Sequence, residues 1–66
     1  MNVINDLIRE LMYQQNKSIS DICAVTCLPY FVVKSIVDYD ISPTAEEAKL
    51  ILNYLGESLE EILGLY

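Results

Sequence analysis

Few side chains in this 66-residue chain could do chemistry, and histidine is absent. Imidazole general-base catalysis, a Ser–His pair and a histidine metal ligand are therefore excluded. Cys23 and Cys27 lie four residues apart, which suggests a redox pair or half of a metal site. Metal sites usually need four ligands, so we interpret Cys23 as a small buried residue and Cys27 as a turn residue. No carboxylate pair has an evident pocket, and we expect neither an enzyme nor a cofactor or small-molecule substrate.

The charge of the chain is acidic and unevenly distributed. Ten acids and four bases give a formal net charge of −6. Residues 1–37 contain three acids and three bases, whereas residues 38–66 contain seven acids and one base, Lys49. An acidic balance argues mildly against nucleic acid and anionic membranes as partners. The neutral amino-terminal half keeps a nucleic-acid partner open.

The sequence predicts a cytoplasmic protein without a membrane span. The first residues are interrupted by polar and charged side chains, unlike a signal peptide. The longest weakly polar run, residues 23–33, is much shorter than the roughly 20 residues that cross a bilayer. Two cysteines without a secretion signal are typical of reduced thiols in a cytosol.

Apolar residues recur with helical spacing along the whole chain, and no segment alternates like a strand. A first helix is expected over residues 2–15. Its apolar stripe contains Val3, Ile4, Leu7, Ile8, Leu11 and Met12, and its solvent side contains Asp6, Arg9, Glu10 and Gln14. A second helix begins at Ser18, where Asp21 completes a capping box, and ends near residues 26–27.

Three further helices are expected. The third begins at Pro29 or Tyr30, buries Val32, Val33, Ile36 and Val37, and is followed by a loop over residues 38–42. The fourth follows Pro43 with a capping box of Thr44 and Glu47, buries Ala45, Ala48, Ile51, Leu52 and Leu55, and ends before a left-handed Gly56. The fifth begins at Ser58, which pairs with Glu61, and buries Leu59, Ile62 and Leu63. The prediction is one compact all-α domain of five helices over residues 1–66.

Residues 18–38 have the spacing of a helix-turn-helix. Ile22 and Cys23 occupy the characteristic positions of the first helix, and Cys27 and Leu28 those of the turn. Val33 and Ile36 occupy those of the second helix. Cys23 is small enough for close helix crossing, and Leu28 would fill the corner. Together with residues 43–47 and 55–63, this motif resembles the Cro/phage-repressor (lambda-repressor-like) family of five-helix domains over nearly the whole chain.

The resemblance implies a small transcriptional regulator, encoded by a phage or mobile element, that binds operator DNA as a homodimer. The second helix of the motif would enter the major groove. The residues on or beside its outer face, which would meet base edges, are Tyr30, Phe31, Lys34 and Ser35. One of the two aromatic residues, Phe31 more than Tyr30, could instead pack in the core. Lys17 and the first amides after Ser18 would meet phosphates. Apolar residues off the main stripes suggest a dimer or partner surface, made of Leu50, Tyr54, Leu65 and Tyr66.

Several positions depart from the family pattern and favour an alternative. Cys27 stands where glycine is usual, and Pro29 stands where a serine or threonine cap is usual. The expected reading face has no Arg, Asn or Gln, which make bidentate contacts with bases. The alternative is an acidic helix-turn-helix that binds a protein instead of DNA, such as a repressor of similar fold, and acts as an antirepressor or modulator.

Overall fold

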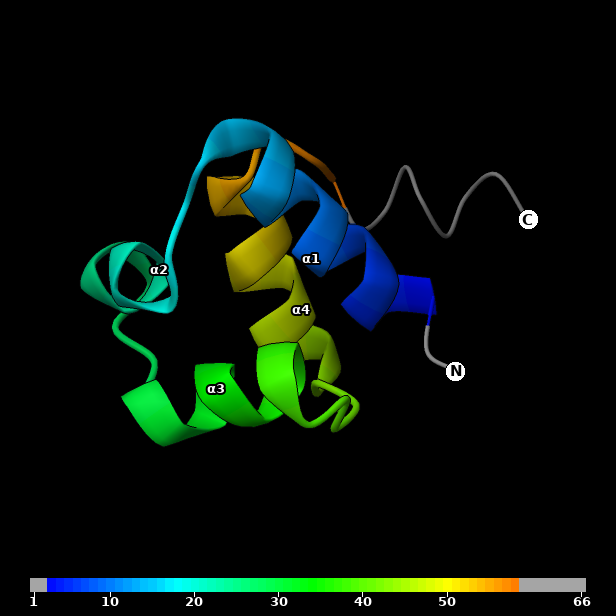
Figure 1. Ribbon diagram of the computed structural model, residues 1–66. Helices are drawn as coiled ribbons and strands as arrows, with labels where there is room; N and C mark the ends of the chain where they lie inside the picture. Colours follow the sequence, from blue (N-terminus) through cyan, green and yellow to red (C-terminus); the bar gives the residue numbers. More distant parts are fainter. Residues whose placement is uncertain (1–2, 59–66) are drawn as a thin grey trace.

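A computed structural model describes residues 3–58 and contains four helices over this range, with no strand among them. The helices are α1 (Val3–Gln15), α2 (Ile19–Thr26), α3 (Tyr30–Asp38) and α4 (Ala45–Tyr54). α1 and α2 each pack against both α3 and α4, and α4 runs through the middle of the arrangement (Figure 1). The prediction of an all-helical globule is confirmed. The expected fifth helix, with Glu61, Leu59, Ile62 and Leu63, lies outside the described residues.

Two capping boxes fix the starts of α2 and α4. The backbone N–H of Asp21 donates to Ser18 Oγ over 3.1 Å, and the N–H of Ser18 donates back to the Asp21 carboxylate over 2.8 Å. Thr44 and Glu47 form the same reciprocal pair at 3.1 and 2.9 Å. Each box satisfies amides that the first helical turn leaves without partners. Both capping boxes were predicted from the sequence, and both are confirmed.

Left-handed residues follow the helices. Gly56 has a φ of 88°, and the N–H groups of Gly56 and Glu57 donate to the carbonyls of Asn53 and Leu52 in a Schellman motif. Asn16 closes α1 in the same way with a φ of 56°. Cys27 closes α2 with a φ of 63°, and its N–H donates to the Cys23 carbonyl over 3.0 Å. The left-handed conformation expected of a turn glycine is therefore adopted by a cysteine.

Replacing Cys27 with glycine is expected to raise the free energy of unfolding by about 0.5–1 kcal/mol. An L side chain in the left-handed region costs roughly 1 kcal/mol, part of which the added freedom of the unfolded chain offsets. Because Cys27 is exposed, the substitution removes little buried surface. Urea unfolding followed by circular dichroism would measure the change. Cys27→Ala, which retains the Cβ atom, is the control and should leave stability nearly unchanged; an equal gain in both variants would contradict the explanation.

The core lies where α1, α2, α3 and α4 meet. Its buried apolar members are Ile8, Leu11, Met12, Ile22, Val33, Ile36, Ala48, Ile51, Leu52 and Leu55. Leu28 packs against them from the connection between α2 and α3, as expected for a corner residue. Two stripe predictions are wrong. Val3 is exposed in the first turn of α1, and Ala45 is exposed in the first turn of α4, since both precede the part of their helix that meets the core.

Two further differences concern helix ends and polar residues. Asp38, expected in a loop, is the last residue of α3. Asn5, which the sequence pattern assigned to neither the apolar stripe nor the solvent side of α1, is fully buried. Over the described residues, no helix combines the length and the apolar content needed to cross a bilayer.

Candidate interaction surface

The outward face of α3, hereafter the α3 face, consists of Tyr30, Phe31, Lys34 and Ser35. Pro29 precedes the helix in an extended conformation, with a φ of −60° and a ψ of 144°, which suits the ring of proline. Burial of Val33 and Ile36 fixes the rotation of α3 about its axis, so the opposite side faces solvent. Tyr30 is 52% exposed and Phe31 72% exposed. The structure therefore places both aromatic residues outward, at the amino-terminal end of α3.

The two polar members of the α3 face are engaged within their own helix. Lys34 Nζ lies 2.7 Å from Asp38 Oδ2, one helical turn further on. This hydrogen bond, with the charge of Asp38, raises the pKa of Lys34, so the ammonium stays protonated. Ser35 Oγ donates to the Phe31 carbonyl over 2.7 Å. Neither side chain extends from α3 as a separate polar group.

The predicted phosphate contacts before α2 are also occupied. Lys17 is half-buried, with its Nζ atom 5.5 Å from the centroid of the Tyr54 ring. That distance is within the range of a cation–π interaction. Ser18 Oγ accepts the Asp21 N–H, and the Asp21 carboxylate accepts the Ser18 N–H. A carboxylate therefore already stands at the amino-terminal end of α2, where a phosphate would bind.

Hydrogen bonds from Ser18 lower the pKa of Asp21 from its ordinary value of 3.8, the backbone N–H being the largest cause. A lowered folded-state pKa means that ionised Asp21 stabilises the fold above about pH 4. This contribution is lost as the pH falls below 3.8 through the lower folded value. Asp21→Asn is therefore expected to be less stable than the original chain near neutral pH and to converge with it in acid. Urea midpoints measured across this pH range would test the prediction, and a constant difference would contradict it.

The predicted dimer or partner surface is only partly described. Leu50 and Tyr54 are half-buried on α4, and Tyr54 packs against the core beneath Lys17. Tyr54 therefore contributes to packing, with the Lys17 ammonium over its ring. Leu65 and Tyr66, the other members of that predicted surface, lie outside the described residues.

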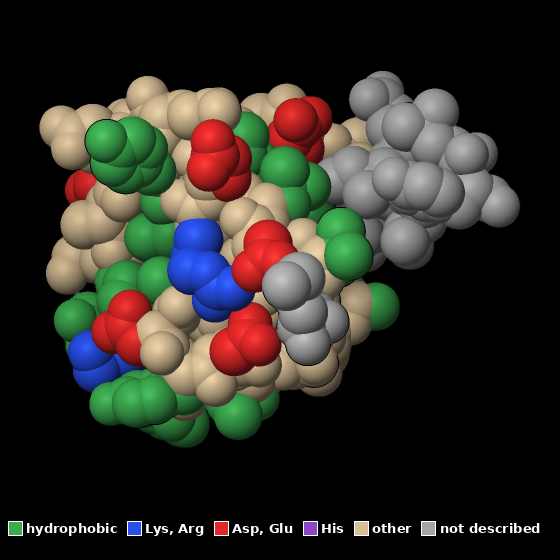
Figure 2. All heavy atoms as spheres, turned by 45° about the vertical axis from the view of Figure 1, so that its right-hand side comes forward, with side chains coloured by type: hydrophobic (Ala, Val, Ile, Leu, Met, Phe, Trp, Pro, Cys, Tyr) green, Lys and Arg blue, Asp and Glu red, His purple; other side chains and the backbone are tan. Residues whose placement is uncertain are grey.

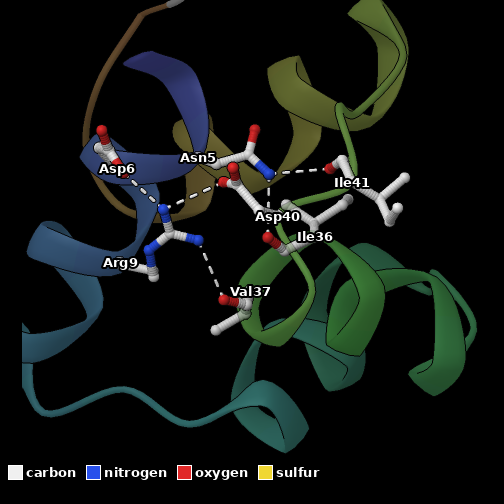
Figure 3. Close-up of polar contacts among 7 residues, drawn as sticks. All are labelled: Asn5, Asp6, Arg9, Ile36, Val37, Asp40 and Ile41. Carbon is white, nitrogen blue, oxygen red and sulfur yellow. Dashed lines mark hydrogen bonds and ion pairs between the residues drawn. The ribbon is translucent and has the colours of Figure 1, made fainter. Parts of the chain in front are cut away.

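Sequence reasoning missed a polar cluster that joins α1 to the end of α3 (Figure 3). Asn5 Nδ2 donates to the carbonyls of Ile36 and Ile41 over 2.9 and 2.8 Å. Arg9 Nη1 donates to the Val37 carbonyl over 3.1 Å. The Ile36 and Val37 carbonyls belong to the last turn of α3, where the helix itself leaves carbonyls without partners, and the Ile41 carbonyl lies in the segment that follows. The available signal was the position of Asn5, three residues before the buried Ile8 on the same side of α1.

Arg9 also joins two carboxylates. Its Nη2 atom donates to Asp6 on α1 and, over 3.1 Å, to Asp40 after α3. The hydrogen bond to Asp6, followed by that to Asp40, raises the pKa of Arg9. The residue expected on the solvent side of α1 is therefore a link between two elements, and its single positive charge is shared by two negative ones.

The cysteines form no visible chemical site. Cys23 is half-buried and packs against the core, and Cys27 is exposed, both as free thiols. In the part of the chain that the structure describes, no group of three His, Cys, Asp or Glu side chains could hold a metal ion. The surface offers aromatic and acidic groups instead. Figure 2 shows acidic side chains beside the basic ones, and hydrophobic side chains at several places on the same face.

Comparison of the chain with protein-family models, with curated proteins and with solved structures gives no match.

Proposed function

We propose that α2 and α3 form a helix-turn-helix of the Cro/repressor type and that the α3 face binds a protein. The chain would then act as a modulator, such as an antirepressor, of a partner involved in transcription. The observation that carries this proposal is the exposure of Tyr30 and Phe31, 52% and 72%, side by side on one helix. Aromatic side chains are enriched among the residues that dominate the energy of protein interfaces.

The polar groups near this surface support a protein ligand over DNA. Lys34 is paired with Asp38, and Ser35 with the backbone of α3. Lys17 lies over Tyr54, and Asp21 occupies the amino-terminal end of α2. DNA affinity depends on basic groups that are available to neutralise phosphates, and the described surface near α3 offers few.

Operator DNA is the second candidate, and one observation favours it. α2 ends in a left-handed residue, Cys27, and Leu28 packs into the corner before α3 begins at Tyr30. This connection leaves the outer side of α3 open, as a recognition helix in the major groove requires. The chain would then be an operator-binding regulator, with α3 reading base edges.

Two binding measurements with matched variants separate the candidates. A library of random peptides, selected on the purified chain, tests for a protein-binding surface; a random-sequence DNA duplex in a low-salt series tests for DNA binding. For a protein ligand, Phe31→Ala should weaken the selected peptides by about tenfold or more. Tyr13→Ala, which removes a more exposed aromatic residue from α1, should leave their affinity unchanged.

The same measurements can overturn the proposal. If DNA is the ligand, the duplex should bind with a steep dependence on salt, and Lys34→Ala should reduce the slope by about one unit. Equal effects of Phe31→Ala and Tyr13→Ala on the peptides would show that the α3 face is not the binding surface.

A further inference from the structure

We propose that the protein bound by the α3 face presents a basic surface around the apolar site that receives Tyr30 and Phe31. This inference rests on the proposed protein-binding function and adds the chemical class of the partner. It follows from the distribution of charge along α3 and on the elements next to it.

The described residues carry more acidic than basic side chains, and the basic side chains near α3 form ion pairs with neighbouring carboxylates. Residues 3–58 contain eight acids and four bases. Arg9 is shared by Asp6 and Asp40, and Lys34 is paired with Asp38. A partner therefore approaches a molecule of net negative charge, and at the end of α3 the carboxylates of Asp6, Asp38 and Asp40 outnumber the basic groups of Arg9 and Lys34 by one.

The outer side of α3 is aromatic in its first turn and charged towards its carboxyl end, where Lys34 is paired with Asp38. Tyr30 and Phe31 occupy its first turn, and Asp38 is its last residue. From Tyr30 to Asp38, eight residues further on, α3 rises about 12 Å along its axis. Asp40 lies two residues beyond Asp38, and with Asp6 it outweighs the charge of Arg9. A partner segment that lies along α3 would meet aromatic rings at one end and carboxylates at the other.

This charge distribution disfavours the other occupants of the surface. A second copy of the chain carries the same net charge of −6 and would bring the same carboxylates to the contact. The phosphates of DNA would also be repelled. A basic protein gains attraction, which raises the association rate and weakens as salt is added. The aromatic contact, by contrast, is insensitive to screening and limits dissociation.

The probes for the test are two amphipathic helical peptides with the same leucine face, one with lysine and one with glutamate at every polar position. Each is titrated into the full chain labelled with ¹⁵N, at low and high salt. The lysine peptide should bind about tenfold tighter than the glutamate peptide at low salt, and the difference should shrink at high salt. Amide shifts should concentrate in α3. Phe31→Ala should weaken the lysine peptide by about tenfold, and Tyr13→Ala should have no effect.

The possible failures are distinguishable. If both peptides bind with equal affinity and Phe31→Ala still weakens their binding, the inference that the partner is basic is overturned. The proposed protein-binding function would remain intact. The lysine peptide could also bind more tightly than the glutamate peptide while Phe31→Ala and Tyr13→Ala change its affinity equally. This result would overturn the proposed function itself, because the peptide would then bind by charge alone. Both substituted side chains are exposed, and amide spectra of the free variants would verify that the fold is retained.

Discussion

Replacing Ile51 with alanine is expected to lower the free energy of unfolding by about 2–5 kcal/mol, the largest effect of any single substitution considered for this chain. Ile51 has no exposed surface and lies in α4, which packs against both α1 and α2. Its truncation removes buried methyl groups and leaves a cavity that rigid neighbouring helices fill only in part. A chain of 66 residues buries a small core, so this loss is a large share of its stability.

The measurement is urea unfolding followed by circular dichroism, with a matched control at Ile41. Ile41 is 56% exposed, and Ile41→Ala removes the same atoms from a site in contact with water. The control should change the free energy of unfolding by less than about 0.5 kcal/mol. A similar, small effect in both variants would mean that the core does not close around α4 as described.

Replacing Asn5 with alanine is expected to lower the free energy of unfolding by about 2–4 kcal/mol. The substitution removes Asn5 Nδ2, which donates to the carbonyls of Ile36 and Ile41. Both carbonyl groups then lose this hydrogen bond at a site that is buried or partly buried. An unsatisfied buried acceptor costs more than the net value of the hydrogen bond that it had made. Within the described residues, Asn5 Oδ1 has no hydrogen-bond partner. The contribution of Asn5 to stability therefore arises from the NH2 group of its side-chain amide.

Asn53 provides the control for Asn5. It lies exposed on α4, and Asn53→Ala should leave the urea midpoint almost unchanged. Amide spectra add a second readout, because loss of the Asn5 contacts should shift resonances at the carboxyl end of α3. A stable Asn5→Ala variant with an undisturbed α3 would contradict the role assigned to this side chain.

Much of the fold could be predicted because its determinants are local. The capping boxes at Ser18 and Thr44 and the left-handed Gly56 depend on residues within a few positions of one another. Helical periodicity then identifies the buried sides. It fails in first turns, as at Val3 and Ala45, because a helix can extend beyond the core that it helps to form.

The surroundings of the candidate surface were harder to predict. The spacing of Val33 and Ile36 places Tyr30 and Phe31 on or beside the outer side of α3, but it left open whether Phe31 packs in the core. In the structure both side chains are exposed. The links of Asn5 and Arg9 to the end of α3 join residues about 30 positions apart, and periodicity within one helix carries no information about them. The pairing of Lys34 with Asp38 was missed for a different reason, since Asp38 was assigned to a loop and not to α3.

The links from Asn5 and Arg9 to α3 also bear on how long the native arrangement lasts. Helical domains with mostly local contacts fold quickly, within microseconds to milliseconds. The Asn5 and Arg9 hydrogen bonds can form only after α1 and the end of α3 have met, so we expect them to form late in folding. Interactions that form late slow the unfolding rate and leave the folding rate nearly unchanged. We therefore expect these two side chains of α1 to lengthen the lifetime of the orientation in which α3 presents its aromatic residues.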